Sequence, residues 1–115
     1  MRRGDIVTVD LSPSRGSGSD NVRPAVVVSN DAANEAASHL GRGVVTVVPL
    51  TTNTARIHHF QVLVPAARSG LRSDRKAQAE QLRSIDINRI SRTVGHLPTD
   101  LIDELDHALR IHLRL

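Results

Sequence analysis

Arginine is the side chain on which most of the possible chemistry of this sequence depends. Fourteen of the fifteen basic residues are Arg, and Lys76 is the single Lys. The planar guanidinium group donates forked hydrogen bonds that match the oxygens of a phosphate, and it stays protonated under all ordinary conditions. This preference for Arg over Lys indicates a partner that carries phosphate groups.

The positive charge lies away from the C-terminal segment. The formal net charge is +3, and residues 99–115 hold four acids and two arginines, so the remainder of the chain carries +5. Such a basic body is typical of proteins that bind nucleic acid, although a solvated surface is the simpler alternative. With one Phe and no Trp or Tyr, the chain has almost no aromatic rings on which bases could stack.

Two further groups of polar residues could contact RNA. Residues 68–76 form a basic loop whose cations could follow the phosphates of a strand: Arg68, Arg72, Arg75 and Lys76. A solvated charge run is the alternative. Glu80 and Gln81 could read base edges, because carboxylate and amide groups match the donors and acceptors of bases. An ordinary polar strand face is the alternative for this second pair.

The histidines do not form a metal-binding pattern. His58 and His59 are adjacent, so on a strand they would face opposite sides, and His107 and His112 diverge on a helix. No HExxH motif is present, and the absence of Cys excludes thiolate ligands, disulfides and a Cys nucleophile. We therefore expect no metal site and no cofactor.

Length and composition predict one folded domain spanning residues 1–115. The chain is 39% apolar and 23% charged, which is typical of a globular protein. No apolar run approaches the roughly 20 residues of a membrane span, and the N-terminus lacks the apolar core of a signal peptide. These features predict a cytoplasmic protein with no membrane partner.

The elements that must position these side chains are mainly strands. A polar Gly/Ser-rich loop is expected at 12–21, a short helix at 31–39 and a helical turn at 86–90. Residues 99–113 carry the clearest helical pattern, with Thr99 or Asp100 as its cap. Strands are expected at 5–11, 24–30, 43–50, 57–64 and 92–97. This order predicts a small, mainly antiparallel β-barrel with a C-terminal α-helix.

Four segments together resemble the MazF/PemK family of toxin endoribonucleases of type II toxin–antitoxin systems. They are RRGDI at 2–6 with VDLSP at 9–13, VRPAVVVSND at 22–31, VVPLTTN at 47–53, and AEQLRSID at 79–86. Each segment alone is weak evidence, but the four occur in the family's order and cover nearly the whole chain.

The resemblance implies a fold, an activity and partners. The fold would be an SH3-like barrel of the PemK/CcdB type that forms a homodimer, with residues 80–85 as a strand near the RNA groove. The activity would be metal-independent, sequence-specific cleavage of single-stranded RNA, with mRNA as the expected substrate. Attack by the 2′-OH would leave 2′,3′-cyclic phosphate and 5′-OH ends. A cognate MazE-like antitoxin would inhibit the toxin.

The family's two signature catalytic positions correspond to Arg23 and Thr51. A guanidinium at Arg23 would stabilise the negative charge that develops on the phosphoryl oxygens, and the Thr51 hydroxyl would donate to the same oxygens. Arg is a poor general base because its pKa lies above about 12. With Arg72, Lys76, Glu80 and Gln81, the further residues expected to bind RNA are Ser17, Ser19, Thr52 and Asn53.

The sequence departs from the family's pattern in its first loop. Many members have a Glu that is proposed to assist proton transfer, and Gly18 occupies that position here. Asp20 lies two residues further on and could take over the role of this Glu. Alternatively, no carboxylate assists.

Two other functions remain open for the same barrel. It could be a non-catalytic toxin that binds a protein target such as a topoisomerase, or a plain RNA-binding module. The Arg23/Thr51 pair and the excess of basic charge favour the endoribonuclease.

Overall fold

Seven strands and three α-helices form the part of the protein that the structure describes. A computed structural model describes residues 1–12 and 21–115. In chain order the elements are β1 (Asp5–Asp10), β2 (Val22–Val27), α1 (Asp31–Leu40), β3 (Val44–Thr51), β4 (Gln61–Val64), α2 (Ala66–Ser69), β5 (Arg75–Gln78), the 3₁₀ turn η1 (Ala79–Gln81), β6 (Arg83–Asp86), the 3₁₀ turn η2 (Ile87–Arg89), β7 (Ile90–His96) and α3 (Thr99–Leu113).

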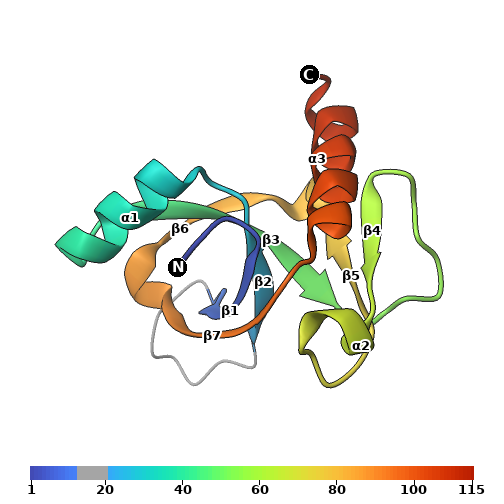
Figure 1. The fold of residues 1–115 in the computed structure, drawn as a ribbon, viewed down its shortest axis with the longest axis horizontal. Coiled ribbons are helices and arrows are strands. Elements are labelled where there is room, and N and C mark those ends of the chain that lie inside the picture. The colour runs from blue at the N-terminus through green and yellow to red at the C-terminus, as the bar shows by residue number, and fades with distance from the viewer. Residues whose placement is uncertain (13–20) are drawn as a thin grey trace.

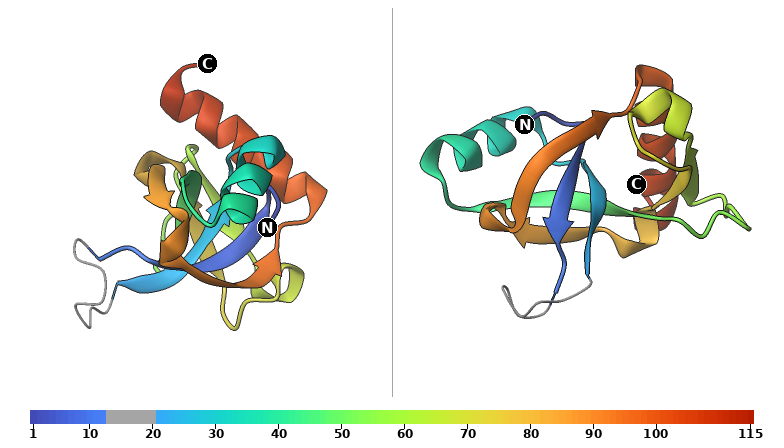
Figure 2. Two further views of the ribbon diagram at one scale, coloured as in Figure 1. Left: turned by 90° about the vertical axis from the view of Figure 1, so that its left-hand side faces the viewer. Right: turned by 90° about the horizontal axis from the view of Figure 1, so that it is seen from below.

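The strands form one curved antiparallel sheet in the order β4-β5-β3-β2-β1-β7 (Figures 1 and 2). β3 is long enough to pair with more than one strand on the same edge: residues 44–47 pair with β6, and residues 50–51 pair with β5. Within the described residues no pairing joins β4 to β7, so the sheet is not closed. The expected mainly β fold with a C-terminal helix is confirmed as an open, barrel-like sheet.

The alternation of side chains along the strands divides the apolar interior into two cores. On β1, Val7 and Val9 enter one core together with valines of β2 and β3, whereas Ile6 enters the other. The second core lies beneath α3, which packs against β4 and η1 (Figure 1). The helix contributes Leu101, Leu105 and Ala108 to it. None of the helices in the described part of the chain is long and apolar enough to span a bilayer.

The first helix begins and ends where the sequence indicates. The side chain of Asn30 accepts a hydrogen bond from the backbone N–H of Ala33, which caps α1 at its N-terminus. Gly41 ends the helix with φ of +68°, and its N–H donates to the carbonyl of Ala37. α1 extends away from the sheet at the end opposite to α2 (Figure 1).

The expected strand at 57–64 is wrong in its first half. The N–H of His58 donates to Oε1 of Gln61 at 3.1 Å, and the N–H of Gln61 donates to the carbonyl of His58 at 2.8 Å. These two bonds close a turn, so β4 begins only at Gln61. His58 lies before the start of β4, so the assumption that it lies on a strand is also wrong. Its ring stacks on that of Phe60 with the centroids 5.2 Å apart.

The expected basic loop at 68–76 contains a helix and part of a strand. α2 covers Ala66–Ser69 and ends at Gly70, and β5 begins at Arg75. The carbonyl oxygen of Ser69 lies so close to Gly95 of β7 that a Cβ there would be only 2.1 Å from it. Gly95 therefore permits α2 to pack directly against the backbone of β7.

The segment at 80–85 is a turn followed by a strand instead of one strand. The N–H of Leu82 donates to the carbonyl of Ala79 at 3.1 Å and closes η1. The turn is needed because the chain moves from one end of β3 to the other: β5 pairs with Leu50 and Thr51, and β6 with residues 44–47.

The predicted cap of the C-terminal helix is also wrong. α3 begins after Pro98, and no side chain caps it. The Asp100 carboxylate instead accepts two hydrogen bonds from the guanidinium of Arg68, at 2.8 and 2.9 Å. This bidentate pair joins α3 to α2.

Candidate functional site

Arg23 lies at the beginning of β2, beside the end of β1. It is paired in register with Val9, and its side chain is half-buried. Its Nη2 donates to Oδ1 of Asn21 at 3.1 Å, which orients the guanidinium along the strand. The N–H of Leu11 donates to the carbonyl of Asn21 at 2.9 Å, so the backbone at the base of the 13–20 segment is held close to Arg23.

The Arg23 pocket, with a volume of about 270 Å³, opens beside this guanidinium. Its polar lining consists of a second guanidinium, Arg83, and three amide side chains. No Asp or Glu belongs to its lining in the described part of the chain. The full lining is Leu11, Asn21, Arg23, Pro49, Gln78, Gln81 and Arg83. Two cations and several amide groups without a carboxylate form a site suited to an anion with many oxygen acceptors, such as a phosphodiester.

Thr51 lies at the same end of the β2–β3 ladder as Arg23 but does not line this pocket. The ladder ends at the pair Ala25–Pro49, with Arg23 two residues before Ala25 and Thr51 two residues after Pro49. Side chains two residues apart on a strand share a face, so the geometry of the ladder directs both toward the same face. The Thr51 Oγ1 accepts a hydrogen bond from the N–H of Asn53 at 3.3 Å, which leaves the hydroxyl hydrogen available for donation.

Of the two residues expected to read bases, only Gln81 lies at the Arg23 pocket. Its neighbour Glu80 does not line this pocket. The Glu80 Oε2 accepts a hydrogen bond from Nε2 of Gln61 at 2.7 Å. The Glu80 Oε1 is buried and has no hydrogen-bond partner among the described residues. Thr52 and Asn53 are exposed after the end of β3.

The two expected phosphate-binding residues of the 68–76 segment have different surroundings. Arg72 lines a separate pocket with two other arginines. Lys76 is only 8% exposed, and its Nζ donates to the carbonyl of Arg56 at 2.8 Å. The ammonium of Lys76 is therefore used inside the protein, and the structure does not bring it to either arginine-lined pocket.

The remaining predicted residues, Ser17, Ser19 and Asp20, lie outside the described residues. The start of their segment is nevertheless defined. The Arg89 guanidinium donates to the carbonyl of Asp10 at 3.0 Å and to that of Ser12 at 2.6 Å. Arg89 thus fixes the end of β1, where the segment begins.

Ion pairs account for part of the basic surface and leave the pockets positive. Arg3 pairs with Asp106 of α3 at 2.6 Å, and Arg68 pairs with Asp100. The Arg68 guanidinium lowers the pKa of the Asp100 carboxyl. In contrast, burial and the like charge of Arg23 lower the pKa of the Arg75 guanidinium, so these two cations lie within electrostatic range of each other.

Sequence reasoning missed Gln78, Arg83 and Arg92 among the residues that line the arginine pockets. Arg83 reaches the Arg23 pocket because β6 pairs with β3 through Arg83 and Val47. The excess of Arg over Lys was a signal for Arg83 and Arg92, but their positions depend on strand pairing.

A small antiparallel β protein whose arginine pockets are lined by no acid in the described part of the chain is suited to a phosphate-bearing ligand. Comparison with known proteins identifies its family. A family model described as PemK-like, MazF-like toxin of type II toxin–antitoxin systems matches residues 2–113. The chain is 56% identical over 115 residues to Endoribonuclease MazF9 of Mycobacterium tuberculosis, covering all of this chain and 98% of that protein. The chain therefore belongs to the PemK-like, MazF-like toxin family, and the resemblance noted in its sequence is confirmed.

Solved structures agree with this assignment. MazF (Form-I) from Deinococcus radiodurans has a TM-score of 0.77 at 26% identity, covering 100% of this chain and 97% of that chain. The MazE–MazF structure (Form-I) from the same organism has a TM-score of 0.73 at 25% identity, with the same two coverages.

Proposed function

We propose that this protein is the endoribonuclease toxin of a type II toxin–antitoxin pair, and that it cleaves single-stranded RNA, chiefly mRNA, at a specific short sequence. The Arg23 pocket is the observation that carries the proposal, because among the described residues it combines two guanidinium groups with three amides and no carboxylate. Family membership and the name of the relative from Mycobacterium tuberculosis support the same activity.

In the proposed reaction the RNA supplies its own nucleophile. The 2′-OH oxygen forms a bond to the adjacent phosphorus, and the bond from phosphorus to the 5′-oxygen breaks. The products are a 2′,3′-cyclic phosphate and a 5′-OH. The attacking 2′-OH loses one proton, and the departing 5′-oxygen gains one. The forked donors of Arg23 stabilise the charge on the phosphoryl oxygens, and the Thr51 hydroxyl donates to the same oxygens. No metal or other cofactor is required.

The substrate-binding residues in this proposal are Gln81, Arg72, Thr52 and Asn53, with Ser17 and Ser19 in the first loop. Arg83 joins them because it lines the pocket with Arg23. Lys76 has a structural role in this proposal, because its ammonium donates a hydrogen bond to the carbonyl of Arg56. A MazE-like antitoxin is the proposed inhibitor, supported by the family description and by the MazE–MazF structure. The proposed site of action is the cytoplasm.

Cleavage of a long single-stranded RNA by the purified protein in EDTA tests the proposal. The expected products end in 2′,3′-cyclic phosphate and 5′-OH, and mapped 5′ ends should share a short sequence. Products with 5′-phosphate ends, or cleavage that requires Mg²⁺, would contradict the 2′-OH mechanism. Binding without cleavage would support an RNA-binding module. A protein that neither binds nor cleaves RNA would support a toxin that acts on a protein target.

The proton acceptor is tested separately through Asp20. If its carboxylate accepts the proton of the 2′-OH, Asp20→Asn should lower the single-turnover rate by about 10²–10⁴-fold. A change of a few-fold at most would remove Asp20 from the mechanism and leave the proton to solvent.

A further inference from the structure

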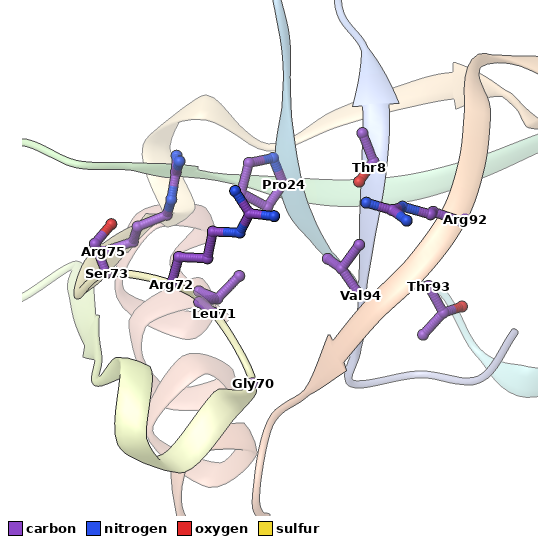
Figure 3. A pocket seen from close by; sticks show the side chains of 10 residues that line it. All are labelled: Thr8, Pro24, Gly70, Leu71, Arg72, Ser73, Arg75, Arg92, Thr93 and Val94. Atoms are coloured by element: carbon purple, nitrogen blue, oxygen red, sulfur yellow. The ribbon is translucent and has the colours of Figure 1, made fainter.

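A second arginine-lined pocket lies on the opposite face of β2 from Arg23. We call it the Arg72–Arg92 pocket; its volume is about 380 Å³, and it lies between the α2–β5 connection and β7 (Figure 3). Pro24, the residue after Arg23, forms part of its wall. Because neighbouring residues on a strand point to opposite faces, the two pockets flank the first residues of β2.

Three guanidinium groups line this pocket, and no carboxylate of residues 1–12 or 21–115 lines it with them. Arg72 and Arg92 extend into the hollow from opposite sides, and Arg75 lies beside Arg72 (Figure 3). No Asp or Glu lines the pocket, and within residues 1–12 and 21–115 neither Arg72 nor Arg92 takes part in an ion pair. Arginines elsewhere, such as Arg3 and Arg68, do pair with acids. This concentration of like charge favours a bound anion.

The uncharged residues that line the pocket indicate which kind of anion fits it. Pro24 and two aliphatic side chains provide apolar surface, and the hydroxyl groups of Thr8, Ser73 and Thr93 provide further donors. A phosphodiester with its attached ribose combines charged oxygens with an apolar sugar face, and it matches this lining better than a small, fully hydrated ion.

Arg75 connects the pocket to the cleavage site. Its Nη1 donates to the carbonyl of Leu50 at 3.2 Å, immediately before Thr51. Its guanidinium is also within electrostatic range of Arg23. An anion beside Arg75 would therefore lie close to the ligand of Arg23.

We propose that the Arg72–Arg92 pocket binds a backbone phosphate of the RNA that flanks the phosphate cleaved at Arg23. This inference rests on the proposed function and extends it to the length of RNA that the toxin holds. The pocket contributes to affinity and to the placement of the strand, whereas the bond-breaking step remains at Arg23.

Binding of a non-cleavable RNA tests the pocket directly. The probe is the shortest RNA that the wild-type protein cleaves, made with a 2′-deoxy nucleotide at the cleavage position. Arg72→Ala and Arg92→Ala should each weaken binding about tenfold, the effect of losing one charge-assisted contact. The slope of log affinity against log salt should become shallower by about 0.7 for each variant.

Replacing single phosphates locates the contact. A neutral methylphosphonate at the flanking position should weaken binding to the wild-type protein but not further weaken binding to the Arg72→Ala/Arg92→Ala double variant. Arg42→Ala is the matched control, because Arg42 is exposed in the turn between α1 and β3 and does not line the pocket. It should change neither affinity nor slope, and unfolding curves should show that all variants are folded.

The outcomes separate this pocket from the cleavage activity. If the wild type cleaves RNA but the two pocket variants bind the probe with wild-type affinity and slope, the pocket proposal is wrong and the endoribonuclease stands. If those variants lose affinity for the antitoxin and not for RNA, the pocket belongs to the protein partner, which also overturns the proposal. If the wild type neither binds nor cleaves RNA, the proposed function itself fails.

Discussion

At the scale of single residues, Arg23 is the proposed catalytic group, and the Asn21 amide orients its guanidinium at the beginning of β2. Arg23→Ala should lower the single-turnover cleavage rate by about 10²-fold or more, since it removes the donors for the developing phosphoryl charge. RNA affinity should fall much less, because several other arginines contact the backbone. Arg23→Lys should not restore the rate fully, since an ammonium cannot donate the forked pair of bonds. A near-normal rate for Arg23→Ala would overturn the site assignment.

The pair formed by Arg68 and Asp100 makes a prediction about acid stability. Its hydrogen bonds lower the pKa of Asp100 below the ordinary value of 3.8. A carboxyl whose pKa is lower in the folded protein stabilises it above that ordinary pKa, and this stabilisation is lost as the pH falls through the folded pKa. Asp100→Asn should therefore cost stability at neutral pH and flatten the fall in unfolding free energy below about pH 5. Parallel curves of unfolding free energy against pH for the variant and the wild type would contradict this role.

At the scale of elements, the close approach of α2 to β7 depends on Gly95. Gly95→Ala would place a Cβ 2.1 Å from the carbonyl oxygen of Ser69, and both atoms belong to or attach directly to backbone. We expect a loss of about 3 kcal/mol of unfolding free energy, measured by chemical denaturation. Gly41→Ala is the control, because no atom lies within 4 Å of the added Cβ and only its φ of +68° is unfavourable. Equal costs for the two variants would show that α2 can move away from β7.

Local sequence patterns were sufficient for the elements whose signals lie within a few residues. The Ala spacing and acidic start of residues 31–39, followed by Gly41, indicated α1, and the alternation along β1 matches its division between the two cores. The errors arose where distant partners decide the structure. Asp100 has the sequence of a helix cap, but Arg68, 32 residues away, uses its carboxylate. The chain turns at η1 because β5 and β6 pair with different parts of β3. Local residue propensities carry no information about these pairings.

The site could be predicted only in part for a similar reason. Arg23 and Thr51 were identified by resemblance, and the ladder between Ala25 and Pro49 explains why they lie at one end of the sheet. Lys76 and Arg72 look alike in the sequence, as two cations of one basic segment, but they differ in burial. Lys76 is buried and binds the carbonyl of Arg56, whereas Arg72 lines a pocket. Burial and register are properties of the assembled sheet, so a charge pattern alone could not distinguish the two residues.

At the scale of the whole molecule, charge predicts how an antitoxin inhibits. The two arginine-lined pockets contain no acids among the described residues, and they flank the first residues of β2. An acidic segment of the antitoxin should therefore compete with RNA for this surface, and the competition should weaken as salt rises. Titrating the toxin–RNA complex with antitoxin, followed by fluorescence anisotropy of labelled RNA, measures the displacement. An inhibited complex that binds RNA at full strength would contradict competition.

The distribution of apolar surface predicts that the toxin works as a homodimer. With one aromatic residue in 115, the chain has a modest core, and several large apolar side chains remain exposed. They include Leu40 (61% exposed) and Val44 (63% exposed) at the end of α1 and the start of β3, and Leu115 (85% exposed) after the end of α3. Pairing two copies would bury such surface and add stability that a small domain otherwise lacks. Sedimentation equilibrium at micromolar concentration should give twice the 12.5 kDa chain mass. A monomer mass there would contradict the dimer, and substitution of Val44 or Leu115 by Glu would then show which apolar end, if either, holds the copies together.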